Sequence, residues 1–195
     1  KVYSPSEYED IIQIFQSAFK EKLSVSILGG MRSYSDNFLN SEISIDMRKF
    51  NNVISLKEGQ LLVQSGATFY EVANFLSNKG HMMEVIPGSG HVTIGGAISN
   101  NIHGKNAYKS GFFGNHVKEI TYIDLASFEI KKCSREVDSQ IFNSIISGLG
   151  VLGVVVEILI NLKKIESLTV IENQIVVENI DDLFNTIEKI EEQAD

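Results

Sequence analysis

The first apolar stripe at helical spacing begins a few residues into the chain. Ser4 is placed to cap a helix, Pro5 suits the first helical position, and Glu7 can complete a capping box. Apolar positions then recur every three or four residues, so we expect an amphipathic helix that packs one face on a sheet. The stripe consists of Tyr8, Ile11, Ile12, Phe15, Ala18 and Phe19.

Short apolar and β-branched runs between polar turns predict strands along the rest of the chain. Thr68 and Glu71 form a second capping-box pattern, which opens a helix that we expect to stop at Gly80. The expected strands are 24–28, 43–46, 53–56, 61–64, 116–125, 129–133, 154–160 and 170–176, and two more helices are expected at 140–146 and after Asn179. This alternation favours α/β or α+β packing over a helical bundle or a β-sandwich.

Glycine gathers in three segments, 29–36, 88–96 and 148–153. The second lies in a stretch, 87–106, that is rich in small residues and amides and has no clean period. We therefore expect a long functional loop there. Backbone N–H groups in such turns can bind phosphate without a basic side chain. Each segment alone is explained by an ordinary tight turn, but three in one short chain favour a large, extended ligand.

The pattern of these segments excludes two common classes of nucleotide site. None of them is a G-x-G-x-x-G fingerprint that opens a dinucleotide-binding helix, because the glycines of 148–153 lead into the expected strand 154–160 instead. None ends in the Gly-Lys-Ser/Thr of a phosphate loop.

Composition narrows the possible partners of this 195-residue chain. Hydrophobic residues make up 43%, enough for a sizeable core, and the net charge of −8 argues against a general nucleic-acid binder. No apolar run approaches the ~20 residues of a membrane span. A lone Cys133 excludes an internal disulfide framework, and His81, His91 and His116 show no metal-ligand spacing, so no metal site is expected. Cysteine usage and the lack of a signal-peptide pattern indicate the cytoplasm.

Several ordered motifs resemble the vanillyl-alcohol oxidase/p-cresol methylhydroxylase flavoprotein superfamily. They are Gly29-Gly30-Met31-Arg32-Ser33-Tyr34-Ser35-Asp36, Pro87-Gly88, Val92-Thr93-Ile94-Gly95-Gly96-Ala97-Ile98, Ile102-His103-Gly104-Lys105-Asn106, Gly111-Phe112-Phe113-Gly114-Asn115-His116-Val117 and Gly148-Leu149-Gly150-Val151-Leu152-Gly153. The resemblance implies an α+β, PCMH-type FAD-binding domain over residues 1–165, with one subdomain at about 1–86 and a second at about 87–165. Residues 166–195 would then begin a C-terminal substrate domain that is largely missing.

The resemblance also implies which residues contact FAD. Carried over position by position, they are Gly29, Gly30, Met31, Arg32, Ser33, Tyr34, Ser35, Asp36, Asn37, Gly88, Thr93, Ile94, Gly95, Gly96, Ile98, His103, Gly104, Lys105, Asn106 and Val154. Relatives with a covalent flavin carry histidine at the position of Arg32, so non-covalent FAD is expected. Met31 and Ser35 stand where glycines are common in the family, and these departures count against a close fit of the first loop to FAD.

For the chemistry, the resemblance implies oxidation of a CH–OH group of a sugar or polyol by hydride transfer to FAD. His103 and Lys105 are the expected catalytic residues: Lys105 would stabilise negative charge on the flavin or bind substrate, and His103 would hydrogen-bond substrate or tune the ring. Without the motif, His103 would merely satisfy loop carbonyls and Lys105 would be a solvated charge. The His-Gly-Lys-Asn motif favours the branch that acts on lipid-linked ribose.

Two other functions remain open at the level of sequence. One is a flavin reductase of a cell-wall nucleotide sugar, and the other is a non-catalytic module whose flavin site has decayed. The apolar stripe Leu183, Phe184, Ile187 and Ile190 would pack on further residues of a substrate domain or pair between molecules. We therefore expect this chain alone to turn over poorly or not at all.

Overall fold

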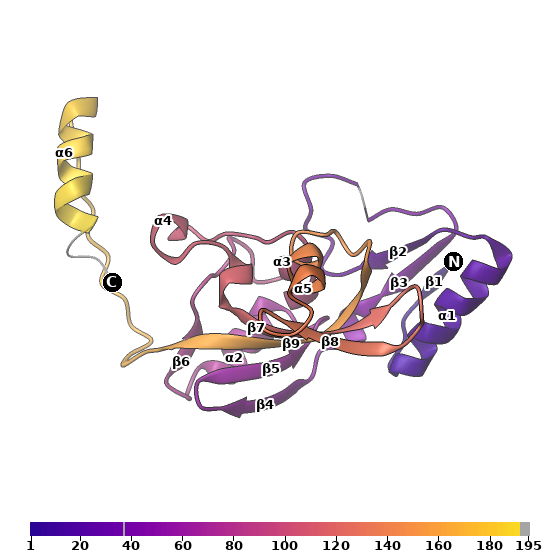
Figure 1. The fold of residues 1–195 in the computed structure, drawn as a ribbon. Coiled ribbons are helices and arrows are strands. Elements are labelled where there is room, and N and C mark those ends of the chain that lie inside the picture. The colour runs from indigo at the N-terminus through magenta and orange to yellow at the C-terminus, as the bar shows by residue number, and fades with distance from the viewer. Residues whose placement is uncertain (37, 192–195) are drawn as a thin grey trace.

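The computed structural model describes residues 1–36 and 38–191, and it contains two β-sheets (Figure 1) and two hydrophobic cores. The smaller sheet has three parallel strands in the order β1-β3-β2. They are β1 (Val2–Tyr3), β2 (Val25–Leu28) and β3 (Ile43–Asp46). Helix α1 (Tyr8–Glu21) covers this sheet and buries Ile11 and Ala18 against it.

Helix α1 starts later than the sequence predicted. Glu7, rather than Ser4, is the N-cap residue, and the backbone N–H of Glu7 donates to Asp10 Oδ2 at 3.3 Å. Phe19 is 78% exposed, so its place in the apolar stripe was wrong; its ring meets the edge of Phe128 with centroids 6.3 Å apart.

The larger sheet is antiparallel and is organised around one long strand, β9 (Gly153–Lys164). Its order is β4-β5-β9-β7-β8, and β6 pairs with the distal end of β9. The partner strands are β4 (Val53–Lys57), β5 (Gln60–Gln64), β6 (His81–Met83), β7 (Val117–Asp124) and β8 (Ile130–Ser134). Strand β9 is longer than the predicted 154–160 because Leu162–Lys164 pair with β6, a three-residue strand that the sequence did not reveal.

Strand β9 belongs to both hydrophobic cores, because alternate residues of a strand point to opposite faces and a register shift between Val155 and Glu157 changes which residues face each core. Val155, Ile158 and Ile160 pack with the helices of the larger sheet, whereas Val154 and Val156 pack with α1 and β3. The near-continuous apolar run of β9 is therefore explained by burial on both faces.

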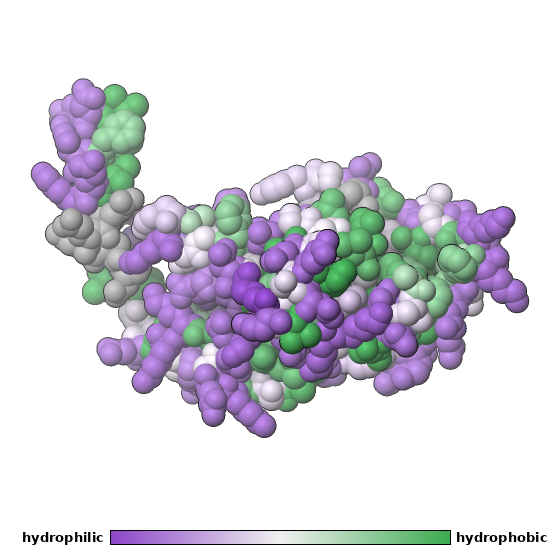
Figure 2. Space-filling model, viewed as in Figure 1, coloured by the Kyte–Doolittle hydropathy of each residue, from purple (hydrophilic) through white to green (hydrophobic). Residues whose placement is uncertain are grey.

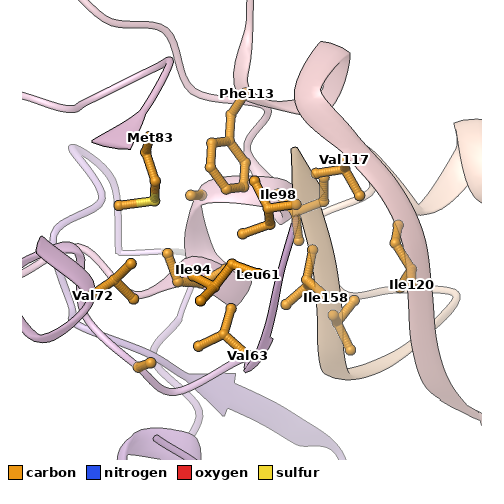
Figure 3. Close-up of a cluster of buried hydrophobic side chains, with 14 of the residues drawn as sticks. Leu61, Val63, Val72, Met83, Ile94, Ile98, Phe113, Val117, Ile120 and Ile158 are labelled. Atoms are coloured by element: carbon orange, nitrogen blue, oxygen red, sulfur yellow. The ribbon is translucent and has the colours of Figure 1, made fainter. Parts of the chain in front are cut away.

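Three helices pack on the larger sheet around the core shown in Figure 3. They are α2 (Phe69–Leu76), α3 (Ile94–Ser99) and α5 (Ser139–Ile145). The predicted capping box of α2 is present: Thr68 N–H donates to Glu71 Oε2 at 2.8 Å, and Glu71 N–H donates to Thr68 Oγ1 at 3.2 Å. The helix ends at Leu76, and a turn rather than a further helical turn leads to Gly80.

Helix α3 lies inside the stretch that the sequence predicted as a long loop. Gly95 and Gly96 occupy its first turn and lower its intrinsic helix propensity, which hides it from pattern analysis. Tertiary hydrogen bonds hold the first turn instead: Ile94 N–H donates to the carbonyl of Ala67 at 2.8 Å, and Gly95 N–H to that of Ser65 at 2.7 Å. Two further short helices follow, α4 (Ala107–Ser110) and the 3₁₀ helix η2 (Phe113–His116), and another 3₁₀ helix, η1 (Met47–Lys49), follows β3.

The C-terminal residues stand apart from both sheets (Figure 1). The predicted strand 170–176 is absent: none of the strands in residues 1–36 and 38–191 pairs with it, and Val170 and Val176 are exposed. Helix α6 (Ile180–Glu191) does begin at the predicted cap, where Asp182 N–H donates to Asn179 Oδ1 at 2.9 Å. Figure 2 shows hydrophobic side chains along one side of this helix and hydrophilic ones along the other. Within the described residues, no helix is long and apolar enough to cross a membrane.

Candidate functional site

The three glycine-rich segments meet around one cavity of about 490 Å³. The loop after β2 forms one wall, the start of α3 forms a second, and the turn that enters β9 forms a third. The cavity is lined by residues 27–35, Phe38, Met47, Ser65, Val92, Thr93, Gly95, Gly96, Ser99, Asn100, Ile102, Leu149, Gly150 and Gly153–Val155. Segments separated by more than a hundred residues in sequence thus surround one volume, which lies within the usual range for small-molecule sites.

Glycine is required where the first wall touches the second. A Cβ atom at Gly29 would lie 2.4 Å from Thr93 Oγ1, and one at Gly30 would lie 2.2 Å from the carbonyl oxygen of His91. These glycines therefore serve chain-to-chain contact as well as approach to a ligand.

The backbone amides of the first wall are available to a ligand. Among the described residues, none of the N–H groups from Gly29 to Ser35 has a hydrogen-bond partner within the chain. Successive unpaired N–H groups in a turn form a concave site for anions. Met31, at φ +52°, adopts the left-handed conformation that glycine favours, which agrees with glycine being common at this position in the resembling family.

The amides at the start of α3 are, in contrast, already used by the fold. Ile94 and Gly95 donate to the carbonyls of Ala67 and Ser65, and Gly96 N–H donates to Thr93 Oγ1 at 3.3 Å. The expectation that this turn offers its amides to phosphate is therefore not met. Its contribution to the cavity is shape, because Gly95 and Gly96 leave the wall without side chains.

The walls combine apolar surface with few polar groups. Ile27, Val92 and Val154 contribute apolar surface, and Ser99 and Asn100 contribute polar atoms. Arg32 is the one formally charged side chain among the described residues that line the cavity. Ser65 also lines it, with a buried hydroxyl that has no hydrogen-bond partner. An apolar cavity with a few polar groups, one cation and a set of unpaired amides suits an elongated ligand that carries phosphate.

Not every residue predicted to bind cofactor lines this cavity. Ile94 and Ile98 point into the hydrophobic core and are fully buried there (Figure 3). Asp36 and Gly88 lie outside the lining, and Asn37 lies outside the described residues. Those that do line it are Gly29, Gly30, Met31, Arg32, Ser33, Tyr34, Ser35, Thr93, Gly95, Gly96 and Val154.

The His-Gly-Lys-Asn segment leaves the cavity at Ile102 and lies beyond its edge. His103 and Lys105 are exposed, and His103 Nδ1 lies 3.2 Å from the carbonyl oxygen of Gly104. The Asn106 side chain holds the loop in place, because its Nδ2 donates to the Glu84 carbonyl and to Ser110 Oγ, both at 3.0 Å. Asn106 thus has a structural role through these contacts. The exposed side chains of His103 and Lys105 are accessible from outside the cavity.

Sequence reasoning missed residues that complete the cavity from neighbouring segments. Ser99, Asn100 and Ile102 follow Gly96 on or just after α3, and their shared face becomes apparent only once that helix is recognised. Ile27 and Leu28 immediately precede the first glycine loop, which was a usable signal. Ser65 gave no signal, because it lies in the turn after β5, outside the glycine-rich segments.

Cys133 contributes nothing to this site. It is buried on β8, and burial raises the pKa of its thiol to about 11, so it remains protonated and unreactive at neutral pH.

Comparison with known proteins agrees with this geometry. The chain matches the FAD binding domain family over residues 1–134. A decaprenylphosphoryl-beta-D-ribose oxidase from Mycolicibacterium smegmatis is 32% identical over 171 residues, which cover 85% of this chain and 37% of the relative. A putative D-arabinono-1,4-lactone oxidase from Neurospora crassa is 29% identical over 156 residues, which cover 79% of this chain and 28% of the relative.

A solved structure shows the same fold. A chitooligosaccharide oxidase superposes with a TM-score of 0.76 at 22% identity, over 84% of this chain and 35% of that chain. The chain thus spans roughly a third of the length of these three proteins. The predicted α+β, PCMH-type fold and the prediction of FAD as cofactor are confirmed. This chain belongs to the FAD binding domain family.

Proposed function

We propose that the chain holds FAD non-covalently in the cavity between residues 29–35, the start of α3 and the turn before β9, as the cofactor domain of an oxidoreductase. The observation that carries this proposal is the convergence of three glycine-rich segments around unpaired amides and one cation. When bound, FAD would accept a hydride from the carbon of a CH–OH group in a sugar or polyol.

The residues present fit the polar and apolar parts of such a cofactor. The unpaired amides of 29–35 and the Arg32 guanidinium would hold the diphosphate, and the apolar walls at Ile27 and Val154 would exclude water from its flanks. No cysteine or histidine lines the cavity in the described part of the chain, and the family resemblance places Arg32 where relatives with a covalent flavin carry histidine. This set of side chains supports the proposal of non-covalent binding.

The proposal assigns residues 1–165 to the FAD-binding domain and 166–195 to the beginning of a substrate domain. Helix α6 supports the second assignment, because its apolar stripe has no partner on the two sheets (Figure 2). In the longer protein this stripe would pack on further residues of the substrate domain or on a second copy. The buried, free thiol of Cys133 is consistent with a cytoplasmic location of the protein, because thiols stay reduced there.

His103 and Lys105 would act outside the cavity, at the junction with a substrate domain. Their exposed position lets them contact a substrate held there. The similarity to oxidases named for a lipid-linked ribose and a sugar lactone supports a sugar as the substrate class.

The function is tested first by the colour and redox behaviour of the full-length protein that carries this chain. We expect yellow protein from which acid releases all of the flavin, as non-covalent binding requires. Anaerobic mixing with sugar alcohols should bleach the flavin, while NADPH alone should not. Bleaching by NADPH alone would identify a reductase, and failure to take up added FAD would identify a decayed site.

Replacing Arg32 by glutamine should weaken FAD binding by about 10- to 100-fold. The reason is that a charge-assisted hydrogen bond contributes roughly 1.5–3 kcal/mol, and each 1.4 kcal/mol changes affinity tenfold. Quenching of flavin fluorescence during titration measures the effect, and the loss should shrink at high salt. Lys20→Gln, on the outer surface of α1, removes the same charge away from the cavity and should leave affinity unchanged. An Arg32→Gln protein with wild-type affinity would show that this cation does not hold the diphosphate.

Replacing Lys105 by alanine in the full-length protein should reduce turnover by about 100-fold or more while FAD content stays near that of the wild type. A cation that stabilises charge in the transition state typically contributes about 3 kcal/mol. Steady-state kinetics and the flavin absorbance per mole of protein separate the two quantities. Equal losses of turnover and flavin would assign Lys105 to cofactor holding instead.

A further inference from the structure

Ser65 presents an unusual combination of burial and unmet hydrogen bonding. The residue is only 3% exposed, and its Oγ is the one buried side-chain nitrogen or oxygen without a partner among the described residues. Its backbone is fully used, since its N–H donates to the Val156 carbonyl at 2.9 Å and its carbonyl accepts from Gly95 at 2.7 Å. The unmet group is therefore the hydroxyl alone.

The hydroxyls of the other buried serine and threonine residues in the described chain all have partners. Ser44 Oγ lies 3.1 Å from Ser26 Oγ, Thr93 Oγ1 accepts from Gly96 N–H at 3.3 Å, and Thr121 Oγ1 lies 3.4 Å from Glu157 Oε2. A buried hydroxyl without a partner destabilises a fold, and alanine would fill the position without that cost. The fold alone gives no reason for serine at position 65.

The location of Ser65 suggests a reason. It lines the cavity where β5 ends, beside Gly95, whose missing side chain leaves room: a Cβ there would lie 2.8 Å from the Cβ of Ser65. Met47 and Val155 line the cavity as well and offer no polar side-chain atom, so Ser65 is the polar residue beside two apolar ones in the lining.

We infer that the Ser65 hydroxyl forms a hydrogen bond with a polar atom of the bound FAD, so that its unmet capacity in the free protein is satisfied by the cofactor. The inference rests on the proposed function, because it requires FAD in this cavity. It adds a cofactor-binding residue that none of the glycine motifs contains. It also predicts that stability and cofactor affinity change in opposite directions when the hydroxyl is removed.

The test compares Ser65→Ala and Ser44→Ala in the full-length protein, first stripped of flavin and then titrated with FAD. Ser65→Ala should bind FAD about three- to tenfold more weakly, the loss expected for one hydrogen bond. Without FAD, its melting temperature should equal or exceed that of the wild type by up to about 4 °C. Ser44→Ala removes a paired hydroxyl away from the cavity, so it should bind FAD normally and melt no higher than the wild type.

The outcomes separate this inference from the proposed function. If the wild type takes up no FAD, the proposed function fails. If the wild type binds FAD and Ser65→Ala binds it equally well, the inference is overturned. It is also overturned if Ser65→Ala melts lower than the wild type without FAD, because the hydroxyl would then support the fold itself.

Discussion

Replacing Gly66 by alanine should destabilise the protein by about 3 kcal/mol or more, enough to lower its melting temperature by roughly 6–12 °C. A Cβ atom at this position would lie 1.8 Å from the carbonyl oxygen of Met47 and 2.8 Å from that of Phe50. Both oxygens belong to backbone, so no side chain can rotate to make room. Gly66 N–H also donates to the Phe50 carbonyl at 2.7 Å, and the added methyl group would break this hydrogen bond.

Thermal unfolding followed by circular dichroism checks this expectation. Gly88→Ala is the matched control for stability, because a Cβ at Gly88 meets nothing within 4 Å and its φ lies outside the left-handed region. The control should melt within about 2 °C of the wild type. Equal melting temperatures for Gly66→Ala and Gly88→Ala would contradict the prediction. They would show that the backbone between β5 and η1 can move apart to accept the methyl group without loss of stability.

Replacing Gly30 by alanine should weaken FAD binding by about 10- to 100-fold. The added methyl group would lie 2.2 Å from the carbonyl oxygen of His91, so the first wall of the cavity must move away from the second. Such overpacking destabilises a structure by roughly 1–3 kcal/mol. Here it would destabilise the conformation in which the unpaired amides of 29–35 are aligned for FAD.

Flavin titration measures the affinity, and circular dichroism verifies that the variant is folded. The larger sheet does not include this loop, so its signal should persist while affinity falls. A folded Gly30→Ala protein with unchanged affinity would mean that the contact between the two walls does not position the amides for the cofactor.

The sequence predicted elements well where local pattern and tertiary structure agree. The capping box at Thr68 and the strand pair 116–125 and 129–133 were identified because capping and alternation act over a few residues. Helix α3 was missed because two glycines in its first turn oppose helix formation locally, while hydrogen bonds from Ile94 and Gly95 to the carbonyls of Ala67 and Ser65 stabilise it. Conversely, 170–176 has strand propensity but no neighbouring strand, and an unpaired strand is not stable alone.

The candidate site was predicted in part for a similar reason. Glycine motifs are contiguous, so the first wall and the turn at Gly95 could be recognised from short stretches. The packing of separate elements decides which further residues line the cavity. Ser65, which follows β5, and Met47, which begins η1, are two such residues. The same packing placed Ile94 and Ile98 in the core rather than on the ligand side.

The two-faced burial of β9 has a consequence for biosynthesis. The first fifty residues can form α1 and pair β1, β2 and β3 as the ribosome releases them, but Val154 and Val156 are needed to cover the open side of that sheet. The cavity wall formed by 27–35 therefore cannot reach its final packing during translation until β9, encoded more than a hundred codons later, has been synthesised. FAD should consequently bind only late in translation. Nascent chains that end before about residue 164, the end of β9, should carry no flavin.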